Sequence, residues 1–439
     1  MRMILTLLTA FLIGNECHGK VIYVAHSGDG SNGETWETAY TSIGHALGAS
    51  GEGDEIRVKQ GTYVEVLSIL DHQVSLIGGY SGVAENDRDW IHNKTIVDGG
   101  NGPSLVVRIR RDAVLDGFTI RGSGASGGIG IIGSSVDVHN CVIEDSEGGI
   151  GGGAFAEEAT VEFVNCTFRN NTADLSGGGL SIARSNAVID SCTIENNSGV
   201  LSGGLDCALS SVILTNSIIR NNQTTGGEVP YGGVSIHLST LVCNNCVVYG
   251  NQTHSAGGDQ AYFYKSEDVM FTNCTIVGGQ SEIGWENGTP SFANCILWGS
   301  GDLFAGTGQL DITYSAVQGG YPGLGNISDD PLFVDPANGN FRLQPESPCI
   351  DAAGTSGPSD DLDGNPRPVD VAGLGRDGTG DEYDMGAYEF QLPAPTPTVT
   401  PTELPTPTMN PASDINQSGK VDTDDLLLLI ADWGKVSGP

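Results

Sequence analysis

A short sequence motif recurs between residues 140 and 297 at intervals of 21 to 29 residues. Its copies begin with an Asn or Ser followed by Cys or Ser, and the second residue falls at positions 141, 166, 192, 217, 246, 274 and 295. The motif is followed each time by a short apolar stretch, as in Cys166-Thr-Phe168. A period in the twenties with short alternating strands is typical of solenoids, in which each repeat packs only on its neighbours.

Each repeat has the same internal order. A strand expected over 161–164 meets a polar corner at Asn165, and a second strand follows with Cys166 and Phe168 inward and Thr167 and Arg169 outward. An Asn pair closes this strand, and a Gly-Gly turn opens a third strand, because both residue types tolerate positive φ. Three strands and three corners per turn predict an all-β right-handed parallel β-helix of about ten coils over residues 56–320.

Two columns of residues test this register. The first outward residue after each inward pair alternates in sign through Arg121, Glu144, Arg169, Glu195 and Arg220. Stacked coils would turn this column into a ladder of opposite charges, with a catalytic cleft as the less favoured alternative. The inward cysteines of the repeat predict a buried thiol stack rather than disulfides or a metal site, because neighbours in one column have parallel Cβ vectors. Three others, Cys207, Cys243 and Cys349, fall outside this column, and their disulfide status stays open.

The net charge and the N-terminal segment limit where the protein can be located and what it can bind. Asp and Glu number 54 against 19 Lys and Arg, for a formal net charge of −35, which argues against nucleic-acid binding. Arg2, the apolar run 3–13 and the small residues Cys17 and Gly19 predict a signal peptide over 1–19. No later segment is long and apolar enough to span a membrane, so we expect a secreted or cell-surface protein.

The repeats and both flanks of the solenoid resemble known families. The segment 168–171, together with the Gly-Gly turn that follows it, is similar to the repeats of chlamydial polymorphic outer-membrane adhesins. The opening 23–33 and the segment 39–47 resemble the N-terminal cap of secreted pectate-lyase-like β-helix proteins, which implies a cap over 20–55 with a short helix over 41–47. Segments 330–336, 341–351, 361–368 and 384–389 resemble the ending of exported bacterial β-helix proteins, which implies a C-terminal cap region over 321–390.

Beyond this cap region the composition changes twice. Residues 391–413 are rich in Pro and Thr and predict an extended, semi-rigid linker. Residues 414–439 resemble one half of a dockerin, a calcium module that binds a cohesin partner, although that family normally has two such repeats. Read as a 12-residue calcium loop, with Gly419 at its turn, the segment offers these ligands: Asp414, Asn416, Ser418, the carbonyl of Lys420, Asp422 and Asp425. The one cofactor expected is calcium, and a metal-free acidic turn is the alternative.

No short sequence motif of a known catalytic site is intact, so the catalytic residues stay unknown. Parallel β-helices assemble sites from several coils, and the absence of a motif therefore leaves an enzyme open, either a polysaccharide lyase or a glycoside hydrolase. A run of aromatics predicts a stacking platform for sugar rings: Tyr249, Tyr262, Tyr264, Trp285 and Trp298. The alternative is that these rings cover a sheet beneath loops. Two functions follow. The first is an exported protein that binds polysaccharide, with or without cleaving it, and is held in a complex or at the cell surface by the dockerin-like module. The alternative is a non-catalytic adhesin or structural surface protein.

Overall fold

The computed structural model describes residues 19–84, 87–226, 232–254, 259–278, 281–299, 301–371, 373–375 and 383–392. The chain divides into two compact units at 391/392, and the first unit holds nearly all of the described residues. The predicted signal peptide up to residue 18, the linker from residue 393 onward and the calcium loop lie outside the described residues.

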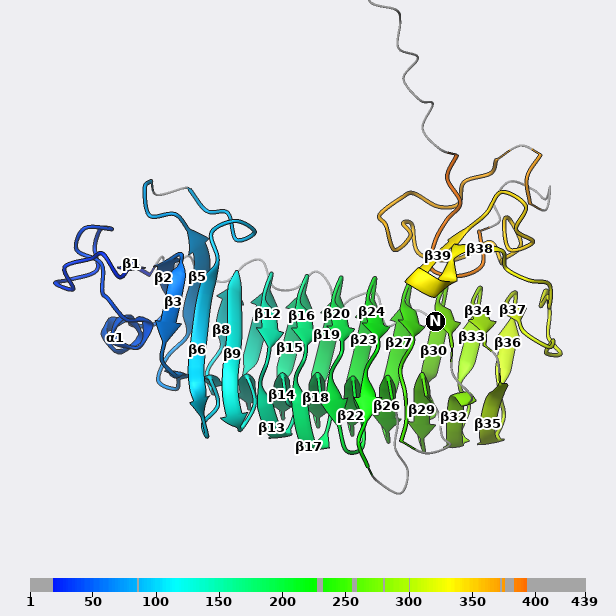
Figure 1. Cartoon of the computed structure of the whole chain (residues 1–439), viewed down its shortest axis with the longest axis horizontal. Coiled ribbons are helices and arrows are strands. Elements are labelled where there is room, and N and C mark those ends of the chain that lie inside the picture. The colour runs from blue at the N-terminus through cyan, green and yellow to red at the C-terminus, as the bar shows by residue number, and fades with distance from the viewer. Residues whose placement is uncertain are drawn as a thin grey trace, which may run out of the picture. The chain divides into compact units, whose positions relative to one another are not determined.

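The first unit is a parallel β-solenoid, as the repeat predicts, with about nine turns where about ten were expected (Figure 1). Each turn runs through three sheets, here named A, B and C in chain order. The strands of each sheet pair in parallel with those of the coils before and after, so residues about one repeat apart become direct neighbours. Cys141, Cys166 and Cys192 are thereby brought together inside the tube.

The three sheets differ in length and shape. Sheet A has twelve strands: β1 (Val21–Val24), β2 (Asp54–Lys59), β5 (Val74–Tyr80), β8 (Ala113–Asp116), β11 (Ser135–His139), β15 (Thr160–Val164), β19 (Asn186–Asp190), β23 (Ser211–Thr215), β27 (Thr240–Asn244), β30 (Val269–Thr272), β33 (Ser291–Ala293) and β36 (Asp311–Thr313). Sheet C has ten: β4 (Leu67–Ile69), β7 (Val107–Ile109), β10 (Ile129–Ile132), β14 (Ala154–Glu157), β18 (Leu180–Ala183), β22 (Leu205–Ala208), β26 (Val234–His237), β29 (Ala261–Tyr264), β32 (Ser281–Gly288) and β35 (Asp302–Gly308).

Sheet B has fifteen strands, some of which form a short side row. The main row is β3 (Gly61–Val64), β6 (Thr95–Gly102), β9 (Phe118–Ala125), β12 (Val142–Glu144), β16 (Thr167–Arg169), β20 (Thr193–Glu195), β24 (Ile218–Arg220), β28 (Val247–Tyr249), β31 (Thr275–Val277), β34 (Ile296–Trp298) and β37 (Ala316–Val317). The side row is β13 (Glu147–Ile150), β17 (Thr172–Ser176), β21 (Ser198–Gly199) and β25 (Gln223–Thr224). The coil therefore has one more short strand in these turns than the three expected.

Positive φ angles at fixed positions turn the chain from one sheet to the next. In one coil they fall at Asn165 (φ 55°), between sheets A and B, and at Asn170 (φ 56°), at the end of the sheet B strand. A third falls at Arg184 (φ 49°), between sheets C and A. Asn adopts this left-handed conformation more readily than most residues, which is why Asn recurs at two of the corners.

Buried polar side chains hold the corners together from the inside. The side-chain oxygen of Asn197 accepts a hydrogen bond from the backbone N–H of Asn171 (3.0 Å), and Asn222 repeats the contact to Asn197 (3.0 Å). All three side chains are fully buried. A polar group in a dry interior is costly unless it is paired, and this ladder pairs each amide with the next coil.

The cysteine column plays the same part at the corner between sheets A and B. The backbone N–H of Cys166 donates to Cys192 Sγ (3.4 Å), and the N–H of Cys192 donates to Ser217 Oγ (3.0 Å). Cys192 Sγ donates in turn to the carbonyl of Asp190 (3.2 Å). The predicted buried thiol stack is thus confirmed for these coils, and Ser replaces Cys in the column because a hydroxyl accepts and donates in the same directions.

One α-helix packs at the N-terminal end. The helix predicted over 41–47 is α1 (Ile43–Ala49), which begins after Ser42, whose hydroxyl accepts from the N–H of His45 (3.1 Å). Ile43 and Ala46 are buried in the core of the solenoid. No helix in the described part of the chain is both long enough and apolar enough to cross a membrane.

The described parts of residues 321–390 fold back over sheet B near the C-terminal end (Figure 1). They contain the antiparallel pair β38 (Phe333–Asp335) and β39 (Asn340–Leu343), joined by a 3₁₀ turn over Pro336–Asn338. Polar contacts bind this segment to the solenoid, among them Arg367 Nη1 to Asn245 Oδ1 (3.0 Å) and Asn294 Nδ2 to the carbonyl of Ser356 (3.0 Å). The segment therefore covers part of the surface on which the sequence places aromatic residues.

Candidate functional site

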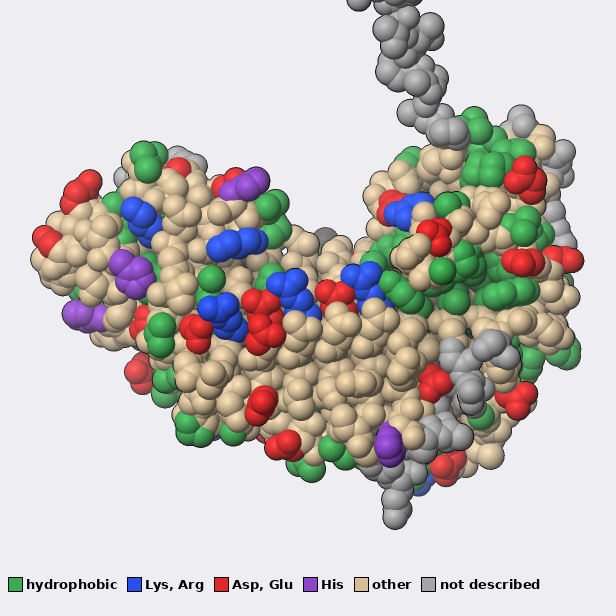
Figure 2. Space-filling model, viewed as in Figure 1, with side chains coloured by type: hydrophobic (Ala, Val, Ile, Leu, Met, Phe, Trp, Pro, Cys, Tyr) green, Lys and Arg blue, Asp and Glu red, His purple; other side chains and the backbone are tan. Residues whose placement is uncertain are grey.

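The predicted charge ladder exists on sheet B, and its role is structural. Figure 2 shows a row in which acidic and basic side chains alternate along one face. Within it Arg121 pairs with Asp98 (2.9 Å), Arg169 with Glu144 and Arg220 with Glu195 (2.7 Å). Each arginine is thus paired with the acid of the coil before it, which favours cross-coil stabilisation over a catalytic cleft.

Trp285 does not belong to a surface platform, which corrects the prediction. Its side chain is 7% exposed and forms part of the solenoid core. Trp285 points inward because it pairs with Phe263, which also points inward. Residues directly opposite each other in a parallel sheet lie on the same face. Ring contact with Phe304 on the next coil (6.4 Å between centroids) completes its packing.

Tyr249 and Trp298 face outward from sheet B but pack against residues 321–390. Tyr249 contacts Phe341 edge-on (4.9 Å between ring centroids), and its hydroxyl accepts from Arg220 Nη1 (3.0 Å). Trp298 packs against the same apolar cluster. For these two residues the structure matches the alternative, in which aromatic rings cover a sheet beneath another segment.

Tyr262 and Tyr264 remain on an outer face, that of sheet C. They alternate along β29 with the buried Ala261 and Phe263, and both are half-buried. His237 on the preceding strand lies close to both rings, with centroids 6.5 Å from Tyr262 and 5.8 Å from Tyr264. Three rings from two neighbouring coils therefore form one patch, which we call the sheet C ring patch.

An ionisable pair adjoins this patch. Asp206 on β22 lies next to Ser235 across the sheet, and it forms side-chain hydrogen bonds with Ser235 and with Ser176. His237 Nε2 is 2.7 Å from Ser235 Oγ, so one hydroxyl stands between the carboxylate and the imidazole. Ser235 itself is fully buried, which makes it a bridge rather than a nucleophile.

Burial shifts both titrating groups toward their neutral forms. Desolvation raises the pKa of Asp206 above its ordinary value, against the hydrogen bonds and the neighbouring imidazole, which lower it. Desolvation likewise lowers the pKa of His237, and the Asp206 carboxylate opposes that change. A carboxyl group that retains its proton closer to neutral pH can serve as a general acid, and such shifts are common at functional sites.

Charged side chains border the patch on its other side. Lys265 Nζ lies 4.8 Å from the ring centroid of Tyr264, a cation–π contact. Glu286 on β32 is the direct cross-strand neighbour of Tyr264 and is exposed. The patch thus combines ring faces, one acid and one base with a cation and an anion at its edge, a mixture suited to a polyhydroxylated ligand.

The sequence marked Tyr262 and Tyr264 as members of this site but missed the pairing of Asp206 with His237. Asp206 and His237 lie on different strands, and no short sequence motif contains both of them. The signal was the repeat itself: aligning the Gly-Gly turns at 203–204 and 232–233 places Asp206 opposite Ser235.

Comparisons with known proteins support the fold. A family model described as "Right handed beta helix region" matches residues 81–241. A search of curated proteins found no match. Among solved structures, pectate lyase Pel9A is similar over 85% of this chain and 96% of its own, with a TM-score of 0.54 and 15% identity. The structure of XylC with xylose covers 84% of this chain and 98% of its own, with a TM-score of 0.51 and 10% identity. The chain therefore shares the β-helix fold with pectate lyase.

Proposed function

We propose that this chain is an exported β-helix protein that binds polysaccharide on the outer face of sheet C. The sheet C ring patch carries the proposal, because the half-buried rings of His237, Tyr262 and Tyr264 lie together beside hydrogen-bonding and charged groups. Aromatic faces stack on the apolar faces of sugar rings, and neighbouring polar groups select hydroxyls. The fold shared with pectate lyase agrees with this ligand class but does not itself assign it.

The charge of the chain indicates which polysaccharides to test first. A formal net charge of −35 repels polyuronates unless a cation bridges the two. Neutral glycans carry no such penalty, so we propose a neutral polysaccharide as the ligand. Asp206 is the group from which a cleavage step would take its proton, and a protein that binds without cleaving is the adhesive alternative.

Retention on insoluble neutral glycans tests the patch. Tyr262→Ala with Tyr264→Ala should weaken retention, by about tenfold for each stacking contact of roughly 1.4 kcal/mol. Tyr40→Ala is the matched control, because Tyr40 forms a similar ring contact with His45 (4.5 Å) in the N-terminal region. Equal retention of wild type and double variant, with unchanged thermal stability, would refute the patch as a binding surface.

Asp206→Asn separates binding from catalysis. If the patch only binds, neither wild type nor variant releases reducing ends from neutral glycans. If it cleaves, the wild type releases them and Asp206→Asn reduces the rate by about a hundredfold or more, as expected for the loss of a general acid. Retention on the glycan should survive the substitution in both cases.

We further propose that residues 414–439 bind calcium and hold the protein in a complex through a cohesin-like partner. Support comes from the order of oxygen ligands from Asp414 to Asp425. Calorimetry on the full chain should show calcium binding that Asp425→Asn weakens. Asp424→Asn is the control, since residue 424 is not a ligand position of the loop. Equal heats for all three proteins would remove the calcium site.

A further inference from the structure

One coil places a thiol where its neighbours place bulky apolar groups. The inward position near the end of each sheet A strand is occupied in successive coils by Val138, Phe163, Ile189, Leu214, Cys243, Phe271 and Phe292. Cys243 therefore projects from sheet A toward the cysteine column, which comes from the corner between sheets A and B. Its Cβ vector differs from those of the column, so the parallel orientation that prevents column neighbours from bridging does not constrain Cys243.

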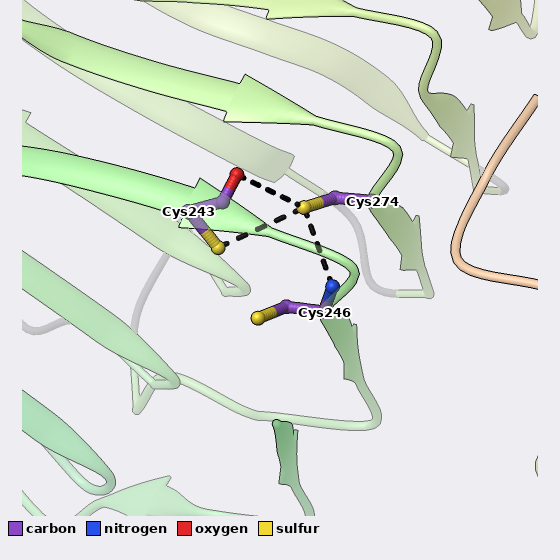
Figure 3. A group of neighbouring side chains, drawn as sticks. All are labelled: Cys243, Cys246 and Cys274. Carbon is purple, nitrogen blue, oxygen red and sulfur yellow. Dashed lines mark hydrogen bonds between the residues drawn. The ribbon is translucent and has the colours of Figure 1, made fainter. Parts of the chain in front are cut away.

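Three sulfurs meet at this point (Figure 3). Cys243 Sγ lies 3.7 Å from Cys274 Sγ, and Cys274 Sγ accepts from the backbone N–H of Cys246 (3.4 Å). All three sulfurs lie within 4.8 Å of one another, and all three side chains have no exposed surface. Among the described residues, this is the one group of three or more His, Cys, Asp or Glu side chains that converges so closely.

The spacing suits thiolate coordination of a small ion. A metal–sulfur bond of about 2.3 Å places two ligating sulfurs roughly 3.7 to 4.0 Å apart, so small rotations of the three side chains suffice. Soft thiolates prefer thiophilic cations such as Zn²⁺ and Cu⁺ over Ca²⁺ or Mg²⁺.

We propose that Cys243, Cys246 and Cys274 form an internal site for one thiophilic d¹⁰ cation, Zn²⁺ or Cu⁺. Each ligand thiol gives up its proton to solvent as the metal–sulfur bond forms, and no electron is transferred. Because the sulfurs are fully enclosed, the ion enters while the coils stack. It then holds the coils of β27 and β30 together.

Metal content after refolding tests the proposal on the full chain. The denatured, reduced protein is refolded with Zn²⁺ in one arm and with Cu⁺ under reducing conditions in the other, then desalted against a chelator. Elemental analysis should find one ion per chain in at least one arm, resistant to the chelator until the protein unfolds. The arm that retains metal identifies the ion.

Two variants and one control make the result specific. Cys243→Leu restores the residue type found one coil earlier, at Leu214, and should reduce retained metal at least tenfold. Cys274→Ser, which copies Ser217 in the same column, should also reduce retained metal at least tenfold. This second variant tests the site even if Cys243→Leu folds poorly. Cys166→Ser changes the column away from Cys243 and should leave metal content unaltered.

Several outcomes would overturn the proposal. Refolded wild type without metal in both arms would do so, as would equal metal in wild type and Cys243→Leu. A mass two hydrogens lower than that of the reduced chain, mapped to a bond between Cys243 and Cys274, would show a disulfide instead of a metal site.

Discussion

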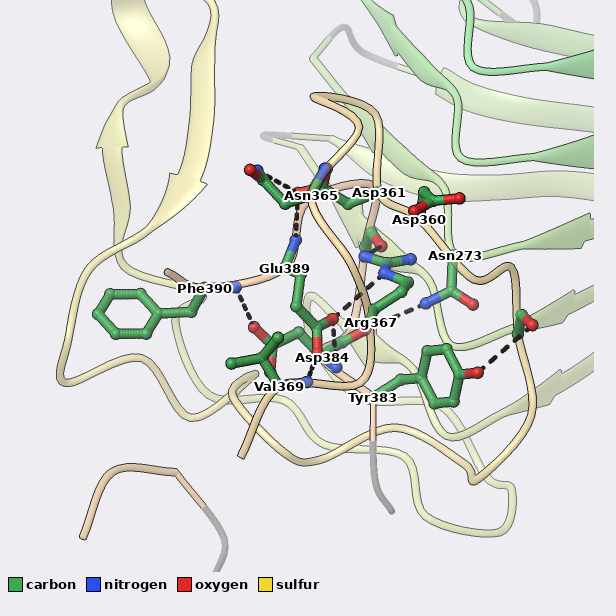
Figure 4. Close-up of polar contacts among 12 residues, drawn as sticks. Asn273, Asp360, Asp361, Asn365, Arg367, Val369, Tyr383, Asp384, Glu389 and Phe390 are labelled. Carbon is green, nitrogen blue, oxygen red and sulfur yellow. Dashed lines mark hydrogen bonds and ion pairs between the residues drawn. The ribbon is translucent and has the colours of Figure 1, made fainter. Parts of the chain in front are cut away.

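Arg367 and Glu389 form an ion pair of 3.2 Å (Nε to Oε2) in which neither side chain has any exposed surface. Figure 4 shows the carboxylates of Asp361 and Asp384 in the same network. Glu389 also accepts from the N–H groups of Val369 (2.8 Å) and Asp384 (3.2 Å). Several buried acids thus share one buried cation, and this network closes residues 321–390 onto the solenoid.

The first prediction concerns pH. Burial raises the pKa of Glu389 and raises that of Asp384 well above its ordinary value, and each carboxylate disfavours ionisation of its acidic neighbours. A raised folded-state pKa contributes stability that is complete below about pH 4, near the unfolded values, and is lost as pH rises through the folded value. We therefore expect residues 321–390 to be held most firmly in mildly acidic solution.

Amide hydrogen exchange measures this effect directly. Protection of the amides of Val369 and Phe390, which donate to Glu389 and Asp384, should fall from mildly acidic to neutral pH after correction for intrinsic exchange. Glu389→Gln should flatten the trend, because one titrating group is removed. Protection that increases toward neutral pH would contradict the assigned direction.

The second prediction compares a buried with an exposed arginine. Arg367→Met leaves buried carboxylates without their cation and should destabilise the C-terminal segment by about 3 to 5 kcal/mol. Arg342→Met removes the exposed pair with Asp363 and should cost less than about 1 kcal/mol. Denaturant unfolding of the two variants checks the difference, and similar losses would argue against a buried network.

The third prediction concerns the inner amide ladder. The Asn197 side chain uses all of its hydrogen-bonding capacity: Oδ1 accepts from Asn171 twice, and Nδ2 donates to Phe168 and Asn222. Asn197→Leu should therefore cost more than about 3 kcal/mol, since each orphaned buried group costs roughly 1 to 3 kcal/mol. Asn196→Gly, at the adjoining position with φ 55°, should change stability little because glycine accepts that angle.

The fourth prediction separates hydrogen bonding from apolar packing in the thiol column. Cys192→Ser keeps an acceptor for the N–H of Cys166 and a donor for the carbonyl of Asp190, as Ser217 does one coil later. Cys192→Ala leaves that N–H unpaired and should be the less stable variant, by about 1 kcal/mol or more. If packing alone mattered, alanine would be the better replacement. Urea unfolding of both variants decides between the two.

Much of the solenoid was predictable because neighbours in space stand at a fixed distance along the chain. Once Cys141, Cys166 and Cys192 are aligned, Glu144 and Arg169 must stack, and the inward and outward faces of each strand follow. The corner asparagines are readable for the same reason, since only a few residue types tolerate their backbone angles. Local periodicity carries all of this information.

The candidate site depended on irregular coils and on contacts across long stretches of chain. Trp285 points inward like Phe263, its partner on the neighbouring strand. The coil length changes after residue 264, so the repeat spacing alone does not align these two residues. Tyr249 is covered because Phe341 packs on it, and Arg367 reaches Asn245 from 122 residues away. The repeat therefore determined how the chain winds, whereas tertiary folding decided which faces stay open, because the segment that covers sheet B obeys no period.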